Sequence, residues 1–187
     1  MHSILKFQSS RCPSGTKQAS FQPPTLTKSP EVPDTESDMS TLAPTEIELT
    51  EMGERLRTVR GAMQTENVDL LIISSMEDIF YLSHFQTVGG CIQCLLVTQQ
   101  HIHIFTRELE VTNANFRSHI PASFYNEAQD PVSTIIQYVS QQYSFKTVGL
   151  QYNSDRLTYH QMRHLETGLQ AVSADVSFTD TSNLISK

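Results

Sequence analysis

The chain has 187 residues, a net charge of −7 at pH 7 and a mean hydropathy of −0.30. Acidic and basic residues balance before Glu46, so the whole negative excess falls on residues 46–187. Duplex nucleic acid and anionic membranes attract proteins of the opposite sign, and neither is expected as a partner. The longest aliphatic runs are also far shorter than the roughly twenty residues that a membrane span needs.

Residues 1–45 differ in composition from the rest of the chain. They hold six of the eight prolines, and their only aromatic residues are Phe7 and Phe21. Such a segment cannot bury enough apolar surface to offset its conformational entropy. We therefore predict a disordered tail over residues 1–45 and a single folded domain over residues 46–187.

The cysteine content indicates a reducing compartment. Three cysteines, one of them in the tail, cannot build a disulfide framework, so we predict a cytoplasmic protein. Residues 1–30 carry four basic and no acidic residues, which is loosely typical of an organelle transit peptide. An organellar location is the alternative; a plain disordered extension, or a true start at Met39, is the preferred explanation of the segment.

The first half of the domain is predicted to begin with a helix and a buried strand. Thr45 and Glu48 are spaced as a capping box, and a helix to about Glu66 follows. Apolar residues recur on one face of it, at Leu49, Met52, Leu56, Val59 and Met63. The continuous apolar run over residues 68–74 predicts a strand buried on both faces. Residues 75–90 are predicted to form an aromatic-rich loop.

Two strands, over residues 91–98 and 101–106, are predicted to form a hairpin. Their connection, Gln99-Gln100, lacks the Gly or Asn that a tight turn prefers. Cys91 and Cys94 form a CxxC pair, but a redox pair would need a helix N-terminus to lower the thiol pKa. We predict both cysteines to lie within the first strand, on opposite faces, as structural residues.

The second half alternates helices and strands. Helices are predicted over residues 108–117, from Pro131 after the cap Asp130, and after the cap Thr158. Strands are predicted over residues 122–125, 147–152 and 176–179. This alternation predicts an α/β fold, a mixed β-sheet flanked by helices on both faces.

The histidine patterns do not predict a metal site. His160 and His164 are spaced as in zinc-peptidase helices, but Gln161 stands where that chemistry needs a glutamate base. We expect both to lie on a solvated helix face, opposite the apolar residues. His101 and His103 alternate with isoleucines, the pattern of a half-buried strand.

Several segments together resemble the N-terminal domain of the creatinase, prolidase and aminopeptidase P family, the pita-bread metallopeptidases (M24 peptidases). Residues 76–85 resemble the family's P-E-N-I-x-Y-L-T-G-F segment, and residues 106–114 its R-x-x-E-x-x-N-A stretch. Tyr125 with Asp130-Pro131 fits its Y-x-D-x-x-D-P. The order and spacing of these pieces match over about residues 46–185. Where the family has Pro, Asn and Gly, this chain has Met76, Asp78 and His84, and only the Gly adopts positive φ without cost.

The resemblance implies that this chain is a non-catalytic, accessory half of a hydrolase. Family catalysis uses a pair of divalent metal ions (Mn, Co or Zn) held in a C-terminal domain, and this chain stops at Lys187, where the linker to that domain would begin. The resemblance implies no catalytic residue, metal ligand or cofactor in this chain. Its implied partners are the missing catalytic domain and further copies in a homo-oligomer. The alternative is a stand-alone binding or oligomerisation module.

The resemblance also implies which residues lie near a substrate or an interface. These are Tyr81, His84 and Phe85 in the 75–90 segment, and Arg107 at a strand end. Arg107 could bind a substrate carboxylate through two hydrogen bonds. An ion pair with a nearby acid such as Glu110 is the alternative for its side chain.

Overall fold

The computed structural model describes residues 46–87 and 90–185, apart from the side chain of Ile47. The predicted disordered tail over residues 1–45 lies outside this part, as does the predicted helix cap Thr45. Helices run over α1 (Glu46–Thr65), α2 (Met76–Ser83), α3 (Val111–Ser118), α4 (Pro131–Gln142) and α5 (Tyr159–Val172), with a 3-10 turn η2 (Glu108–Glu110). Strands are β1 (Leu70–Ile73), β2 (Cys94–Val97), β3 (Ile102–Arg107), β4 (Ala122–Tyr125), β5 (Thr147–Leu150) and β6 (Ser177–Asp180).

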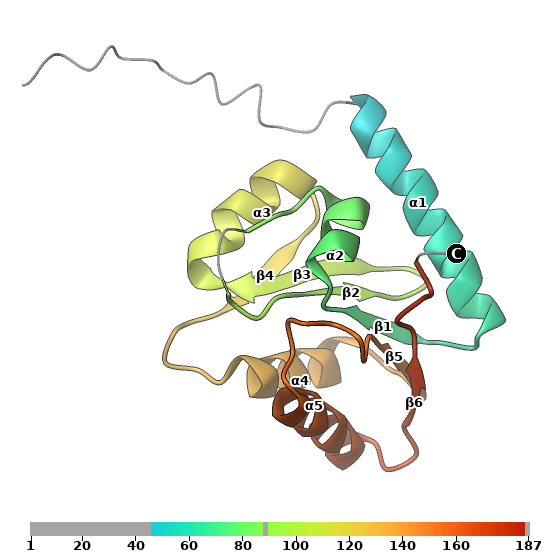
Figure 1. Cartoon of the computed structure of the whole chain (residues 1–187), viewed down its shortest axis with the longest axis vertical. Helices are drawn as coiled ribbons and strands as arrows, with labels where there is room; N and C mark the ends of the chain where they lie inside the picture. Colours follow the sequence, from blue (N-terminus) through green and yellow to red (C-terminus); the bar gives the residue numbers. More distant parts are fainter. Residues whose placement is uncertain (1–45, 88–89, 186–187) are drawn as a thin grey trace, which may run out of the picture. The chain divides into compact units, whose positions relative to one another are not determined.

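Within the described residues, six strands form one mixed sheet in the order β4-β3-β2-β1-β5-β6 (Figure 1). β2 is antiparallel to both β1 and β3, whereas the pairs β1·β5, β5·β6 and β3·β4 are parallel. β1 lies between two strands and under helices on both faces, so all four of its residues are buried. The predicted buried strand and the predicted α/β fold are therefore confirmed.

Two hydrophobic cores lie on opposite faces of the sheet. Leu70 and Ile72 of β1 point into the core that α4 and α5 cover, and Leu71 and Ile73 point into the core under α1, α2 and α3. Figure 1 shows these two helix layers on either side of the strands. The alternation along β1 thus places apolar side chains in both cores, which explains its continuous apolar sequence.

The hairpin between β2 and β3 forms without a glycine. The hydroxyl of Thr98 accepts hydrogen bonds from the backbone N–H groups of Gln100 and His101, and the Thr98 N–H donates to the His101 carbonyl. A side-chain acceptor therefore satisfies the turn donors. The register pairs Val97 with Ile102, which keeps the apolar residues of both strands on matching faces.

The predictions for residues 75–90 and for Cys91 are wrong in part. Residues 76–83 form helix α2, because the Ser75 side chain caps the Asp78 N–H and acidic residues occupy the first turn. The strand begins at Cys94, so Cys91 precedes it and only Cys94 belongs to the ladder. The loop that was predicted over residues 75–90 therefore starts only after His84.

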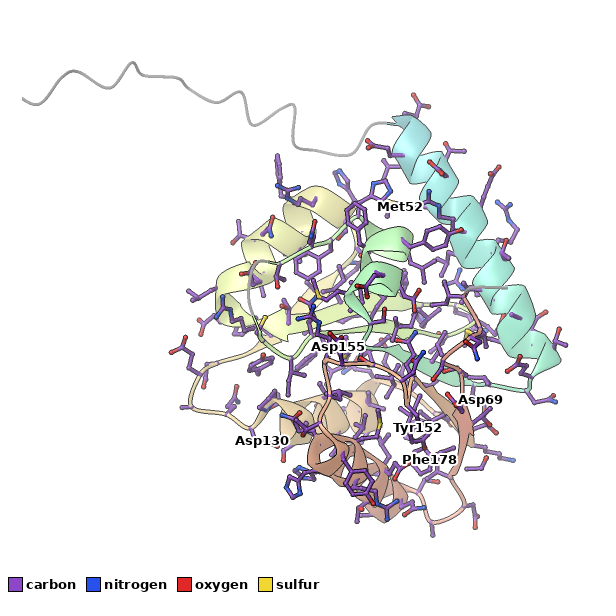
Figure 2. The ribbon with its side chains drawn as sticks, viewed as in Figure 1. Met52, Asp69, Asp130, Tyr152, Asp155 and Phe178 are labelled. Atoms are coloured by element: carbon purple, nitrogen blue, oxygen red, sulfur yellow. The ribbon has the colours of Figure 1, made fainter. Side chains whose placement is uncertain are left out.

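The predicted helix starts in the second half are confirmed. Asp130 accepts from the Ser133 N–H with Pro131 following, and Figure 2 shows Asp130 at the start of α4. Thr158 and Gln161 form a full capping box on α5. On α1, Met52, Val59 and Met63 are buried, whereas Leu49 of the predicted stripe is exposed. Among the described residues, no helix is both long enough and apolar enough to span a membrane.

Candidate functional site

Helix α2 carries the predicted site residue Tyr81, and a second one, His84, caps its C-terminal end. It directly follows β1, and Ile79 and Leu82 bury one side of it in the core beneath. The opposite side presents Phe80 and Tyr81, which are 47% and 42% exposed. Two large rings are therefore held on the surface by a helix whose other side is fixed in the core.

Arg55 of α1 holds Tyr81 in place. Its guanidinium carbon lies 4.2 Å from the centre of the Tyr81 ring, a cation–π contact. Its Nη1 donates to the Tyr81 backbone carbonyl at 2.8 Å, and Nη2 pairs with Glu51 one helical turn earlier. The same side chain thus orders the ring and joins α1 to α2.

His84 ends α2 in the left-handed conformation, with φ of 54°. This is the position where the resembling family segment has a glycine, and the histidine adopts the glycine-like conformation despite its side chain. The imidazole stacks on Phe80 with ring centres 5.7 Å apart, and its Nδ1 lies 3.9 Å from Oε1 of Glu48 on α1. His84 therefore also connects α2 with α1.

These side chains define what we call the α1–α2 surface: Leu49, Arg55, Phe80, Tyr81 and His84. Sequence reasoning identified Tyr81 and His84 but missed Phe80, Arg55 and Leu49. The signal for Phe80 was the Ser75 cap with acidic residues after it, which indicates a helix over residues 76–83; in that helix Ile79 and Leu82 face inward. Nothing in the sequence alone indicated that Arg55 would lie over Tyr81.

Phe85 lies in a different environment from its neighbours. Its side chain is 0% exposed and belongs to the core under α1, α2 and α3. Its backbone N–H donates to the buried Ser83 hydroxyl, which fixes the chain as it leaves α2. Because the ring packs inside the domain, we leave Phe85 out of the α1–α2 surface.

Arg107 is placed at the end of β3, beside a hollow of about 620 Å³ that Glu108, Leu109 and Glu127 help to line. Its Nη2 lies 3.4 Å from Oε1 of Glu110, so the alternative ion pair is formed. Its Nε is buried and meets no hydrogen-bond partner among the residues that the structure describes. In the described part of the chain, no hydrogen bond, ion pair or ring contact joins Arg107 to Tyr81 or His84.

The cysteines and the histidine pair do not converge on a site. Cys91 and Cys94 are free, and burial raises the pKa of the Cys94 thiol, which disfavours the reactive thiolate. His160 and His164 are exposed, as predicted, and His164 Nδ1 lies 3.7 Å from Asp130. Within residues 46–87 and 90–185, no group of three or more His, Cys, Asp or Glu side chains is arranged to hold a metal ion.

Solved structures share this fold. The N-terminal domain of an X-Pro dipeptidase from Streptococcus pyogenes is 21% identical, with a TM-score of 0.59 over 71% of this chain and 97% of that chain. The Xaa-Pro aminopeptidase of Streptococcus thermophilus is 17% identical, with a TM-score of 0.55 over 72% and 95%. The prolidase of Pyrococcus horikoshii is 17% identical, with a TM-score of 0.56 over 71% of this chain but only 33% of that one. No curated protein matches this chain.

A family comparison covers most of the folded part. The sequence model of the creatinase/prolidase N-terminal domain matches residues 55–187, which extend from the middle of α1 to the end of the chain. The resemblance based on residues 76–85 and 106–114 is therefore confirmed. The chain belongs to the creatinase/prolidase N-terminal domain family.

Proposed function

We propose that this domain is the accessory, non-catalytic part of a metal-dependent hydrolase that acts on Xaa-Pro peptides or a related small amide. In this proposal the domain docks on the catalytic domain of a neighbouring subunit, helps to form a homo-oligomer and shapes that neighbour's active site. Family membership supports it, as does the match to about one third of the length of the Xaa-Pro dipeptidase of Bacillus anthracis and of the Pyrococcus horikoshii prolidase.

The observation that carries the docking proposal is the α1–α2 surface. Exposed aromatic rings and arginine are the side chains that most often dominate binding energy at interfaces. Tyr81 is already held by Arg55, and Phe80 by stacking on His84, so a partner would lose little side-chain entropy in contacting them. The surface is thus pre-ordered for a protein contact.

The last described residues also favour this face. Leu184 is buried, and Ile185 packs against the core under α1 and α2. A catalytic domain in the same polypeptide would therefore start from the face of the sheet that carries the α1–α2 surface. This agrees with a role for that surface in contacts between domains or subunits.

Arg107 is the proposed contribution to a neighbour's active site. Its side chain is 31% exposed, and Nη2 is the nitrogen that pairs with Glu110. The guanidinium presents two donor edges, so an approaching substrate carboxylate would compete with Glu110 for one of them. In this proposal the catalytic domain would hold the divalent metal pair; among the described residues, no group of three or more His, Cys, Asp or Glu side chains is arranged to hold a metal ion.

The homo-oligomer part of the proposal is tested by the mass of the full chain in solution. We expect light scattering to show concentration-dependent self-association that Phe80→Ser weakens, because the variant removes the exposed ring and leaves the buried side of α2 intact. Tyr159→Ser is the matched control, since Tyr159 is 82% exposed on α5, on the other face of the sheet. A mass that stays monomeric at all concentrations, or an equal effect of both variants, argues against self-association through this surface.

Any coding sequence downstream of residue 187 distinguishes the accessory role from the alternative, a stand-alone binding or oligomerisation module. A downstream segment with the aspartates, histidine and glutamates of a two-metal site supports the accessory role. A downstream segment without these residues supports the alternative, a stand-alone binding module. The compartment, cytoplasmic or organellar, stays a prediction.

A further inference from the structure

The sheet has an open edge at β4. β4 pairs with β3 on one side, and no strand within the described residues pairs with its other side. The Pro121 carbonyl accepts from the Ile104 N–H on the β3 side. Because alternate residues of a strand turn their backbone groups to opposite sides, the N–H and C=O groups of Ala122 and Phe124 face the open edge. Such an edge is a template for one more strand.

β4 lacks the features that usually protect an open edge, which are charged side chains, a bulge or a proline in the strand. Its sequence, ASFY, is uncharged, and it pairs with β3 residue for residue. Pro121 precedes the strand, but its backbone turns towards β3 and leaves the open edge free. At the opposite end of the sheet, β6 finishes with exposed Asp180. Of the two end strands, β4 is therefore the one suited to pairing.

Helix α4, beside this edge, is uncharged as well. A hollow of about 300 Å³ lies between β4 and α4, and the helix lines it with Thr134, Gln137, Tyr138 and Gln141. Among the α-helices that the structure describes, α4 alone contains no Asp, Glu, Lys or Arg. Charged residues are depleted at the buried centre of protein interfaces. The face formed by β4 and α4 can thus be covered without burying a charge.

We propose that a second copy of this chain covers this face. Its β4 would pair antiparallel with β4 of the first copy, across a two-fold axis at Ser123. Ala122 of each copy would then stand opposite Phe124 of the other, and the two residues of each pair would exchange both backbone hydrogen bonds. This inference rests on the homo-oligomer of the proposed function and assigns one of its interfaces.

The side chains of β4 are complementary to their own copy in this register. Ala122 packs against the core on the α3 side of the sheet, and Phe124 follows two residues later on the same face of the strand. The Phe124 ring is 48% exposed, and the small Ala122 of the other copy leaves room for it. Ser123 lies on the other face, where its Oγ is 3.0 Å from Nε2 of His103. The axis therefore brings no unpaired polar side chain into the contact.

The charge of the domain favours this face for contact between copies. Residues 46–187 carry the whole negative excess of the chain, so two copies repel each other wherever their acidic surfaces meet. A contact through uncharged β4 and α4 keeps those surfaces apart. Backbone hydrogen bonds along the strand edge then supply the attraction, and they do not depend on opposite charge.

Amide hydrogen exchange of the full chain, followed residue by residue by NMR, tests the proposal. We expect the amides of Ala122 and Phe124 to exchange about tenfold more slowly when the protein concentration is raised about a hundredfold. Phe124→Lys should abolish this dependence at Ala122, because it removes the exposed ring and places a lysine on the edge. The matched control is Tyr159→Lys at the 82% exposed Tyr159 of α5, which should leave the dependence unchanged.

A second measurement identifies the neighbouring strand. In a mixture of isotope-labelled and unlabelled chains, an intermolecular NOE should connect the Ala122 methyl group of one chain with the Phe124 ring of another. Phe80→Ser should leave this NOE and the protection of β4 unchanged, because it alters only the α1–α2 surface. Failure of docking through that surface is therefore seen separately from failure of pairing at β4.

Four results would overturn the proposal. Exchange at Ala122 and Phe124 that is equal at all concentrations would exclude a second copy at the edge. Concentration-dependent protection without the intermolecular NOE would exclude the antiparallel pairing of β4 with itself. An equal effect of Tyr159→Lys would show that the added charge, and not the edge, controls association. Loss of the protection in Phe80→Ser would assign the association to the α1–α2 surface instead.

Discussion

Replacing Gln151 by alanine should destabilise the domain more than any surface substitution. Gln151 is 1% exposed and follows β5. Its Oε1 accepts hydrogen bonds from the backbone N–H groups of Ser74 and Ser75, each at 2.9 Å, and its Nε2 donates to Asp78 Oδ2 at 2.5 Å. One side chain thus connects the end of β5 to the end of β1 and to the first turn of α2.

The expected loss follows from the groups left without partners. Each backbone N–H that loses its acceptor away from water costs about 1–3 kcal/mol, and each buried methylene removed costs about 0.8 kcal/mol. Water reaches Ser75 more easily than Ser74, so its N–H contributes at the lower end. We expect Gln151→Ala to reduce the free energy of unfolding by about 3–5 kcal/mol. For a domain of this size, that lowers Tm by about 10–15 °C.

Urea unfolding followed by circular dichroism measures this loss, with Gln170→Ala on the exposed side of α5 as the matched control. Gln151→Glu tests the Asp78 contact separately, because it keeps the acceptor but places a carboxylate against Asp78. Two carboxylates in contact hold a shared proton more tightly than separated ones. The cost of Gln151→Glu should therefore be small at low pH and grow as pH rises. A loss for Gln151→Ala no larger than that of the control would show that these hydrogen bonds do not stabilise the domain.

Three further predictions concern the helix ends and one buried phenol. His119→Gly should raise Tm by about 3 °C. The reason is that exposed His119 ends α3 at φ of 53°, a conformation that costs an L-residue about 1 kcal/mol. An unchanged Tm in a thermal melt would contradict this prediction. Asp130→Ala should cost about 1 kcal/mol at neutral pH. The Ser133 hydrogen bonds lower the pKa of Asp130, so this cost should disappear as pH falls through that lowered pKa; a pH-independent cost in acid titration would contradict it. Burial raises the pKa of Tyr125 to about 12, so its contribution to stability is complete below about pH 10 and is lost as pH rises towards 12. Tyr125→Phe should flatten the alkaline stability curve by up to about 1.4 kcal/mol per pH unit, and an equally steep curve would argue against burial of the phenol.

The elements that sequence reasoning predicted correctly are those with a strong local signal. Asp130-Pro131 and Thr158 fix the starts of α4 and α5 through caps that depend only on neighbouring residues. β1 was predictable because a strand covered on both faces needs apolar residues at every position. The sheet class follows from the alternation of such segments.

Helix α2 was missed because its signal is mixed. Exposed Phe80 and Tyr81 stand beside buried Ile79 and Leu82, so the apolar run shows no clear period of 3.6 residues. The cap at Ser75 and the acids that follow it were the available signal. Tertiary contacts decide where the neighbouring rings lie. The Tyr81 ring is held at the surface by its contact with Arg55, whereas the Phe85 ring packs in the core. Neither placement depends on residues close in sequence.

We propose that this chain is an accessory domain and not itself the catalyst. The most direct measurement is proline release from an Xaa-Pro dipeptide by the purified full chain, supplied with Mn²⁺ or Co²⁺. We expect no release above the metal-only control. Metal-dependent release that follows the chain through successive purification steps, and is lost on chelation, would contradict it.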